Sequence, residues 1–462
     1  MAENSAIPVE LGTEKIGKLL KQYALPAIIA QTASSLYNMV DSIFIGQGVG
    51  PLAISGLAVT FPLMNLSTAF GTLVGAGAAT MLSVLLGQKN YKAANKVLGN
   101  VVSLNVILGL VFMAVALIFI DPILYFFGAS ENTLPYAKEY IQIILYGNIV
   151  THLYFGLNAA MRSSGNPKKA MALTIFTVVF NTILDPIFIF VFDMGIAGAA
   201  WATVIAQTAA FFIVLHHFND KKREVHFEKG MFRLDLRVAK DSLAIGFGPF
   251  LMNSAACLVS LFINQQLRKY SGDLGIGAYG ICNRINFMFI MICMGLNQGM
   301  QPIAGYNYGA RQYSRVREVL WKTIRLGMLM TTICFIFGMF FPKAAVGIFT
   351  HDEQLLELSA RALRITTIAF PIVGFQMIGT NFFQSLGMVR KSIILSLSRQ
   401  ILFLLPLIYL LPKWMGADGV WASFPIADCI ATVMTAVMLG QLFRKFSMLK
   451  DGDDPSILGS QL

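Results

Sequence analysis

The sequence predicts an all-α membrane protein with twelve transmembrane helices in two pseudo-symmetric six-helix bundles. Three observations favour this fold class. Of the 462 residues, 56% are hydrophobic and 13% charged, and the mean hydropathy is +0.66, which is far above that of an average soluble protein. Apolar stretches long enough to cross a bilayer recur along the whole chain. The two halves of the chain also resemble each other in sequence.

Each apolar stretch of about 20 residues or more can cross roughly 30 Å of hydrocarbon as an α-helix. Twelve such spans are expected, at residues 23–46, 53–86, 97–120, 137–159, 168–192, 196–217, 241–267, 276–308, 319–341, 356–385, 392–411 and 417–443.

Most of the 35 Lys and Arg residues fall in every second connecting segment, starting with the N-terminal one. The positive-inside rule then predicts a multi-pass protein of the cell membrane with both termini in the cytoplasm. The net charge of +11 therefore reflects orientation, and no nucleic-acid partner is expected. Residues 1–22 lack the apolar core of a cleavable signal, so the first span is expected to direct its own insertion.

An internal repeat of about 222 residues sets the domain organisation. Pro26 corresponds to Pro249, and Gly71-x-x-x-Gly75 corresponds to Gly295-x-x-x-Gly299. "GQKNYKAANKVL" from residue 87 matches "GARQYSRVREVL" from residue 309, and "GIAG" matches "GADG". Because each repeat holds an even number of spans, both cross the membrane in the same sense. The expected parts are a cytoplasmic segment (1–22), an N-lobe (23–216), a cytoplasmic connector (217–240), a C-lobe (241–446) and a cytoplasmic tail (447–462).

The repeat also draws attention to two acidic residues inside apolar spans. When Pro186 is aligned with Pro406, Ile401 replaces Asn181 and Leu405 replaces Asp185 in the second half. Asp41 likewise has its counterpart near the amides Asn264 and Gln265. A six-helix bundle can thus be built without either acid. An acid at the centre of a membrane helix costs roughly 2.5 to 3.5 kcal/mol, which favours a functional role over an inert structural one.

The residues around these acids are polar and share a helical face. Asn181 and Asp185 are four residues apart, and Pro186 leaves the carbonyl of Thr182 without its helical donor. In the first span, Gln31, Ser34, Asn38 and Asp41 form a polar stripe, with Tyr37 one turn before Asp41. Loss of hydration disfavours a charged carboxyl group, so such an Asp can exchange protons near physiological pH.

Other polar residues in the spans carry weaker signals. Arg284 is expected either to meet substrate or to bind helix-end carbonyls, and Asp428 is expected to pair with Arg399. The five cysteines and five histidines show no metal-ligand or disulfide spacing. "GTEKIGKL" at residues 12–19 has Leu19 where a phosphate loop needs Ser or Thr, so no nucleotide, metal or other cofactor is expected.

Several of these segments together resemble the multidrug and toxic compound extrusion (MATE) family. They are "YNMVDSIFIG" at 37–46, "NTILDPIFIFVFDMGIAGAAWAT" at 181–203 and "GADGVWAS" at 416–423. The resemblance covers residues 15–446 and implies a cation-coupled exporter, not an enzyme, that opens alternately to either side. It also implies an N-lobe proton site at matching positions, which are Tyr37, Asp41, Asn158, Asn181, Asp185 and Thr203.

The resulting hypothesis is an antiporter that exchanges protons, or sodium, for amphipathic and often cationic drugs. Protonation of Asp41 and Asp185 would bend the first helix at Pro26, and Gln31, Asn38 and Arg284 are candidates for the substrate cavity. The span 243–267 lacks the acid that some relatives use for sodium, which argues against a C-lobe sodium site. The expected partners are small-molecule drugs, the coupling cation and membrane lipid, with the protein acting as a monomer.

Two other functions remain open from the sequence alone. A flippase for lipid-linked saccharides has a related architecture but should line its cavity with Arg and Lys, of which only Arg284 and Arg399 lie in spans. An intramembrane aspartyl enzyme would use two acids that share a proton, but the chain lacks a paired acid motif.

Overall fold

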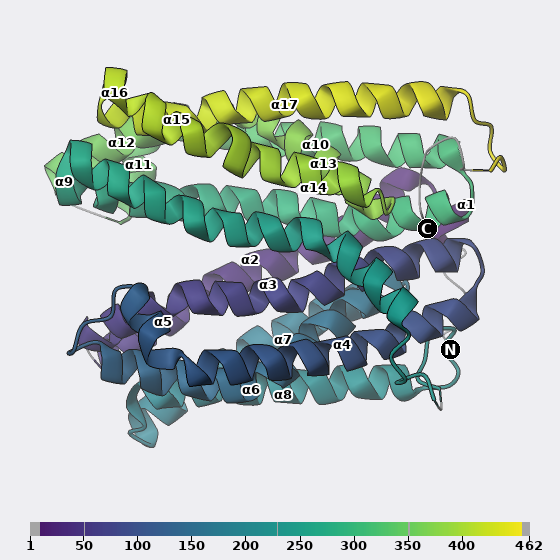
Figure 1. Ribbon diagram of the computed structural model, residues 1–462, viewed down its shortest axis with the longest axis horizontal. Coiled ribbons are helices and arrows are strands. Elements are labelled where there is room, and N and C mark those ends of the chain that lie inside the picture. Colours follow the sequence, from purple (N-terminus) through teal and green to yellow (C-terminus); the bar gives the residue numbers. More distant parts are fainter. Residues whose placement is uncertain (1–9, 50, 229, 350–351, 455–462) are drawn as a thin grey trace. The chain divides into compact units, whose positions relative to one another are not determined.

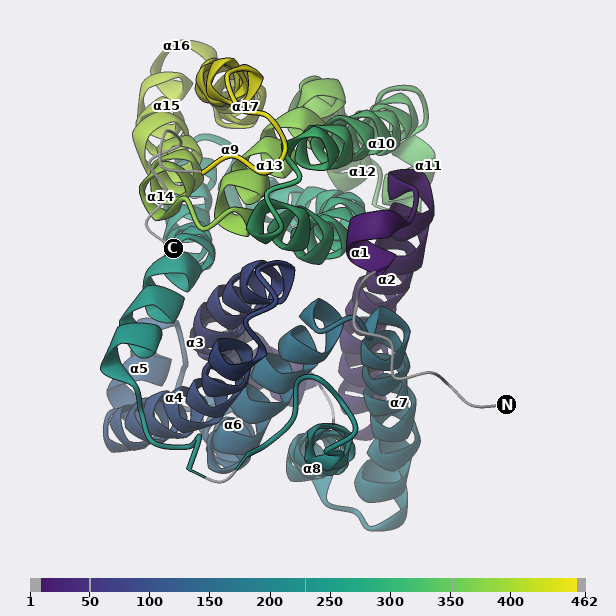
Figure 2. The ribbon, with the colours of Figure 1, turned by 90° about the vertical axis from the view of Figure 1, so that its right-hand side faces the viewer.

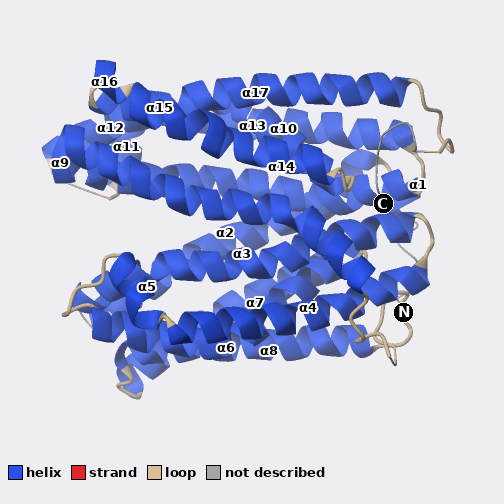
Figure 3. Cartoon of the chain, in the orientation of Figure 1, coloured by secondary structure: helices blue, strands red, loops and turns tan. Residues whose placement is uncertain are grey.

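All regular secondary structure in the described part of the chain is helical. The computed structural model describes residues 10–49, 51–228, 230–349 and 352–454, and these ranges contain no β-strand (Figure 3). The first half holds α1 (Glu10–Thr13), α2 (Ile16–Gly48), α3 (Pro51–Gly87), α4 (Tyr91–Ile118), α5 (Ile120–Phe126), α6 (Leu134–Ser163), α7 (Pro167–Pro186), the π-helix η1 (Ile187–Val191) and α8 (Gly195–Asn219).

The second half repeats this order after the connector (Figure 1). It holds α9 (Leu236–Gly309), α10 (Tyr313–Phe340), α11 (Pro342–Gly347), α12 (Glu353–Thr367), α13 (Phe370–Ser385), α14 (Val389–Leu397), the π-helix η2 (Ser398–Leu404), α15 (Leu405–Leu410), α16 (Pro412–Met415) and α17 (Ala417–Ser447).

The twelve expected spans correspond to these helices. Within the described residues, nine helical segments are long and apolar enough to cross a membrane, and a tenth results if α12 and α13, bent by 54°, count together. The long helix α9 supplies two of them, because Gly272 (φ +63°) interrupts its helical geometry. The helices α2 and α6, which at 33 and 30 residues are long enough to cross a membrane, complete the twelve.

The sequence repeat is also a repeat of backbone conformation. Asn90 and Gln312, which precede α4 and α10, have φ/ψ of −94°/71° and −96°/70°. The residues before them, Lys89 and Arg311, both adopt a left-handed conformation with φ of 58° and 57°. A residue in this conformation commonly ends a helix, so each half turns from its second long helix into its third in the same way.

The helices form two compact units. The first comprises Met1–Glu14 and Ile29–Phe250, and the second comprises Lys15–Ile28 and Leu251–Leu462. Within each unit the helices run side by side, as the view along them shows (Figure 2). In the first unit α6 packs on α3, α4 and α8, and in the second α13 packs on α10 and α17.

Small residues allow close helix crossings in both units. In the second unit, a Cβ on Gly299 would lie 2.4 Å from the Cα of Ala24, and one on Gly295 would lie 2.6 Å from the Cα of Ile28. In the first unit, the Gly71 and Gly75 positions face His152 and Gly156 of α6 at 3.2 and 3.5 Å. These glycines therefore act in helix packing, as small-xxx-small motifs do in membranes.

Candidate functional site

The candidate site begins on α7, where an amide and an acid lie one turn apart. Asn181 and Asp185 are 2% and 0% exposed. The Asn181 Nδ2 donates to Asp185 Oδ1 at 3.4 Å and lies 3.4 Å from the Thr203 Oγ1 of α8. The predicted stacking of Asn181 and Asp185 is therefore present, and it extends to a neighbouring helix.

The packing of α8 explains why Thr203 reaches this pair. A Cβ on Gly198 would lie only 2.9 Å from the backbone of Phe188 in η1, and Ala199, Ala200 and Ala202 are fully buried. These small residues let α8 approach α7 and η1 closely. Thr203 follows on the same helix and binds its own helix through the Ala199 carbonyl, at 3.1 Å.

Helix α2 contributes a tyrosine and the second acid. The Tyr37 hydroxyl hydrogen-bonds to Thr203 Oγ1 at 3.0 Å. Asp41, one turn further on, is 6% exposed and close enough to Asp185 for their charges to interact. We call Tyr37, Asp41, Asn181, Asp185 and Thr203 the carboxyl cluster. It lies wholly within the first unit and joins α2, α7 and α8.

The carboxyl cluster contains more hydrogen-bond acceptors than donors. Asp41 Oδ1, Asn181 Oδ1 and Asp185 Oδ2 are buried and accept no hydrogen bond from the described residues. The nearby side chains are apolar, because Ile45, Ile189 and Ile196 form a buried core beside the site. Buried polar atoms are normally paired, so three unpaired oxygens in one place call for a partner that brings a proton or a positive charge.

A fourth helix, α6, places Tyr140 beside the carboxyl cluster. The sequence did not identify this residue. Its side chain is 1% exposed and interacts electrostatically with both Asp41 and Asp185. One tyrosine among fourteen carries no spacing signal. Only the packing of α6 against α8 reveals its position.

Asn158 lies apart from the carboxyl cluster. It donates to Thr174 Oγ1 at 3.0 Å and to the Tyr154 hydroxyl at 3.4 Å. Thr174 precedes Asp185 by eleven residues on α7, which is about 16 Å along the helix axis. The family resemblance groups Asn158 with the carboxyl cluster, whereas its hydrogen bonds in this structure are to Thr174 and Tyr154.

The remaining candidates lie elsewhere on the same helices. Pro26 is buried inside α2, and Gln31 is partly buried one turn beyond it. Arg284 is exposed on α9. The side chain of Asn38 lies outside the described part of the structure. Arg399 and Asp428 form the expected ion pair, with Nε and Oδ1 separated by 2.5 Å.

The site and fold together define a class before any comparison with known proteins. Long apolar helices that bury carboxyl groups, amides and hydroxyls are typical of membrane proteins that handle ions or polar solutes. The chain is thus a multi-pass membrane protein of the transporter class.

Comparison with known proteins identifies the family. The MatE family model matches residues 26–187 and 245–410, so the chain belongs to the MATE family, whose members are transporters and not enzymes. The multidrug export protein MepA of Staphylococcus aureus (strain MRSA252) is 28% identical over 427 residues, which cover 92% of this chain and 94% of MepA. MepA of Staphylococcus haemolyticus (strain JCSC1435) is 27% identical over 435 residues, covering 94% and 96%.

Comparison with solved structures also identifies MATE transporters. The MATE multidrug transporter DinF-BH, solved in complex with a ligand, is 36% identical, with a TM-score of 0.88 and coverage of 95% of this chain and 98% of that one. A MATE structure in complex with MaL6 is 22% identical, with a TM-score of 0.90 and coverage of 97% and 100%, and shows the shared fold alone. The fold class predicted from the sequence is confirmed.

Proposed function

We propose that this protein is a multidrug efflux antiporter that exports amphipathic and cationic drugs in exchange for protons. The observation that carries the proposal is the surplus of buried, unpaired oxygens in the carboxyl cluster. Two acids that are buried side by side cannot both remain charged without a partner. A site of this kind favours binding a proton in one state of the transport cycle and losing it in another.

Protonation would satisfy the carboxyl cluster directly. A carboxylate only accepts hydrogen bonds, whereas a protonated carboxyl group also donates one. A proton on Asp185 or Asp41 could therefore be donated to one of the unpaired oxygens nearby. It would also remove one negative charge from the first unit, and a cationic drug would then be held less strongly. Drug and proton thus shift each other's binding equilibrium, as an exchanger requires.

The nature of the cargo rests on the relatives and the composition. The MepA relatives are named as multidrug export proteins, and DinF-BH is named as a multidrug transporter. The chain is 12% aromatic and has 23 Met residues, which suit a pliable surface for varied apolar ligands. We propose that two lobes, residues 23–216 and 241–446, open alternately in the cell membrane with both termini in the cytoplasm. Gln31, Asn38 and Arg284 are proposed to contact drug in a monomeric protein.

Efflux from proteoliposomes tests this function. Vesicles with purified protein and a fluorescent cationic dye would receive a pH gradient in one arm and a sodium gradient in the other. The wild type should move dye with the pH gradient and much less with the sodium gradient. Asp185→Asn should abolish the pH-driven movement, because an amide cannot take up the proton.

Asp193→Asn provides the matched control. Asp193 is exposed eight residues away and has φ of 51°, a conformation that Asn tolerates. This control should transport at the wild-type rate. Full pH-driven efflux by Asp185→Asn would contradict the proposal, and efflux driven equally well by sodium alone would contradict the choice of the proton.

A further inference from the structure

The connector between the two halves is docked on the start of α4. The Asn95 Nδ2 donates to Glu228 Oε1 at 2.7 Å, and the backbone N–H of Asp235 donates to Asn100 Oδ1 at 3.1 Å. Both asparagines are buried. A Cβ on Gly99 would lie 2.2 Å from the Met231 carbonyl oxygen. Buried amides and a glycine thus hold this segment in a defined position on α4.

The docked connector and the start of α4 line two open hollows that share Lys92, Asn95 and Glu228. Their volumes are about 530 and 520 Å³. Bases outnumber acids in their walls. The bases are Lys92, Lys96, Lys221, Lys222, Arg223 and Arg233, and the acids are Glu224, Glu228 and Asp235. Glu228 accepts a hydrogen bond from Asn95, and Asp235 lies 4.0 Å from the Lys96 ammonium group. Lys92 and Arg233 have no ion-pair partner among the described residues.

The hollows lie where α4 changes from polar to apolar. The Ser103 Oγ donates to the Phe232 carbonyl at 2.7 Å. One turn beyond Ser103, α4 begins to expose large apolar side chains, which are Ile107, Leu110, Val111, Val115 and Ile118. On the connector, Phe232 and Leu234 are 49% and 37% exposed on either side of Arg233. Apolar side chains next to bases at such a boundary are typical of the lipid headgroup region.

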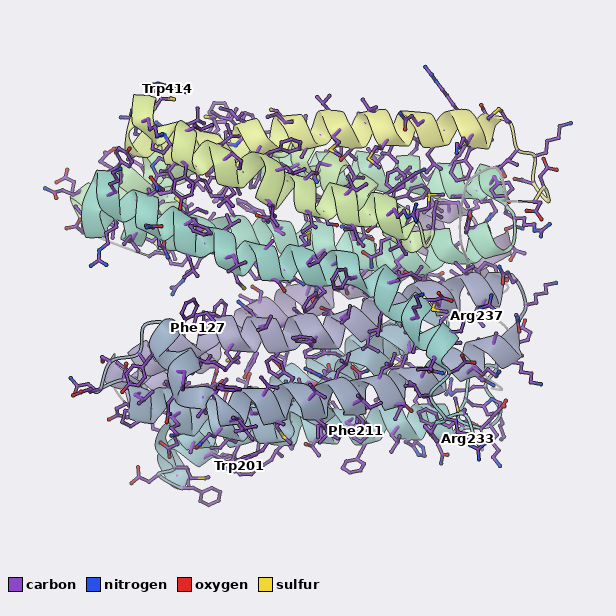
Figure 4. The ribbon with its side chains drawn as sticks, viewed as in Figure 1. Phe127, Trp201, Phe211, Arg233, Arg237 and Trp414 are labelled. Carbon is purple, nitrogen blue, oxygen red and sulfur yellow. The ribbon has the colours of Figure 1, made fainter. Side chains whose placement is uncertain are left out.

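Figure 4 places Arg233 and Arg237 at the same end of the first unit. Leu236, between them in sequence, is 76% exposed. The bases and apolar side chains therefore continue along the connector into the start of α9.

The second half docks a segment at the corresponding place with a different arrangement of charges. At the start of α10, Ser314 and Glu318 stand at the positions of Lys92 and Lys96. The segment that docks there carries acids, since Asp451 Oδ1 accepts from the Ser314 N–H at 2.9 Å and the Asp453 carbonyl accepts from the Tyr313 hydroxyl at 2.8 Å. The second half also has bases here, Arg311, Arg315 and Arg317, but its docked segment supplies acids to them, since Asp454 lies 3.8 Å from Arg311. In the first half, the docked connector leaves Lys92 and Arg233 without an ion-pair partner among the described residues.

We propose that the hollow lined by Lys92, Lys96 and Arg233 binds the headgroup of an anionic phospholipid from the cytoplasmic leaflet. Lys92, Lys96 and Arg233 hold the phosphate through charge-assisted hydrogen bonds. The acyl chains lie along the apolar face of α4, beside Phe232 and Leu234. The site is separate from the carboxyl cluster, so its test does not depend on proton exchange.

Native mass spectrometry of the purified full-length chain tests the proposal. The protein would be titrated with phosphatidylglycerol and, separately, with phosphatidylcholine. The wild type should bind phosphatidylglycerol more tightly. The triple variant Lys92→Gln, Lys96→Gln, Arg233→Gln should bind it about tenfold or more weakly, because each base near an anionic headgroup contributes to binding. The single variant Arg233→Gln should show a smaller loss and guards against misfolding of the triple variant.

The matched control removes three bases from the second half, through Arg325→Gln, Arg444→Gln and Lys445→Gln. It should keep the wild-type affinity for phosphatidylglycerol. The proposal is overturned if the triple variant binds as tightly as the wild type, or if the control loses as much. Displacement of the lipid by millimolar inorganic phosphate would show a soluble-anion site instead, which would also overturn it.

Discussion

The residues around Pro186 show what Asp185 adds to its helix. Both halves place a proline beside a π-helix, since Pro186 precedes η1 and Pro406 follows η2. A proline lacks the N–H that a regular helix needs, which accounts for the altered turn in each half. The π-helix lies after the proline in the first half and before it in the second half, where Leu405 replaces Asp185. A π-helix beside a proline therefore forms without an acid in the second half, which favours a role in function for Asp185.

Thr203 hydrogen-bonds to Tyr37 of α2 and to Asn181 of α7, so its hydroxyl should matter for the coupling of proton and drug movement. Thr203→Val keeps the side-chain shape but removes the hydrogen bonds to Tyr37 and Asn181. We expect pH-driven efflux to fall about tenfold, because lost hydrogen bonds of this kind are worth roughly 0.5 to 1.5 kcal/mol each. Efflux rates in proteoliposomes at equal protein content would measure this.

Thr208→Val is the control for this substitution. Thr208 lies on the same helix, and its hydroxyl binds the Val204 carbonyl of that helix at 2.7 Å. If Thr208→Val and Thr203→Val reduced efflux equally, the effect would come from the helix and not from the carboxyl cluster.

The sequence could predict those site residues that share a helix with an acid. Asn181 is one turn from Asp185, and Tyr37 is one turn from Asp41, so helical spacing suffices to group them. Tyr140 and Asn158 both lie on α6, and their surroundings depend on how α6 packs against other helices. Spacing within one helix contains no information about that packing. This is why spacing could not identify Tyr140, and why Asn158 entered the candidate site only through the family resemblance.

At the scale of elements, α9 depends on close contact with the start of α2. Gly299→Ala would place a methyl group 2.4 Å from the Cα of Ala24, which is backbone that cannot move aside easily. We expect a loss of about 1 to 3 kcal/mol in stability, the usual effect of overpacking. The melting temperature of the purified protein in detergent would report it.

Gly280→Ala is the matched control on the same helix, since a Cβ there meets nothing within 4 Å. It should leave the melting temperature unchanged or slightly raised, because Ala favours helix more than Gly does. An equal loss in both variants would mean that the contact with Ala24 is not the cause.

The C-terminal tail caps α10 from outside the helix. Asp451 accepts hydrogen bonds from the backbone N–H and the hydroxyl of Ser314, at 2.9 and 2.5 Å. Burial alone would raise the pKa of Asp451, but the hydrogen bonds from Ser314 and from the Tyr313 backbone outweigh it and lower the pKa. A lowered pKa means that this contact is present above the ordinary pKa of Asp and is lost as the pH falls through the lowered value.

Asp451→Ala should therefore destabilise the start of α10 by about 1 kcal/mol at neutral pH, as the loss of a helix cap does. Hydrogen exchange of the amides near Ser314 would increase relative to wild type at pH 7, and the difference would shrink in strong acid. Equal protection of these amides in both proteins at pH 7 would contradict the capping role.

At the scale of the whole molecule, the boundaries of the two units fall beside the paired prolines. The chain passes from the second unit to the first after Ile28, two residues beyond Pro26, and returns after Phe250, one residue beyond Pro249. The first turns of α2 pack within the second unit, where Ala24 and Ile28 meet Gly299 and Gly295. The repeat predicted two bundles, but this exchange of helix ends depends on contacts far apart in sequence, which no local pattern contains.

The central claim is that the carboxyl cluster exchanges a proton when drug binds, and proton release by the purified protein tests it most directly. Drug would be added to weakly buffered protein in detergent at neutral pH while a pH-sensitive dye is followed. The wild type should release protons in proportion to the drug bound, and the double variant Asp41→Asn, Asp185→Asn should bind drug without releasing any. Equal release by both proteins, or drug binding by the wild type with no release at any pH between 5 and 9, would contradict the account.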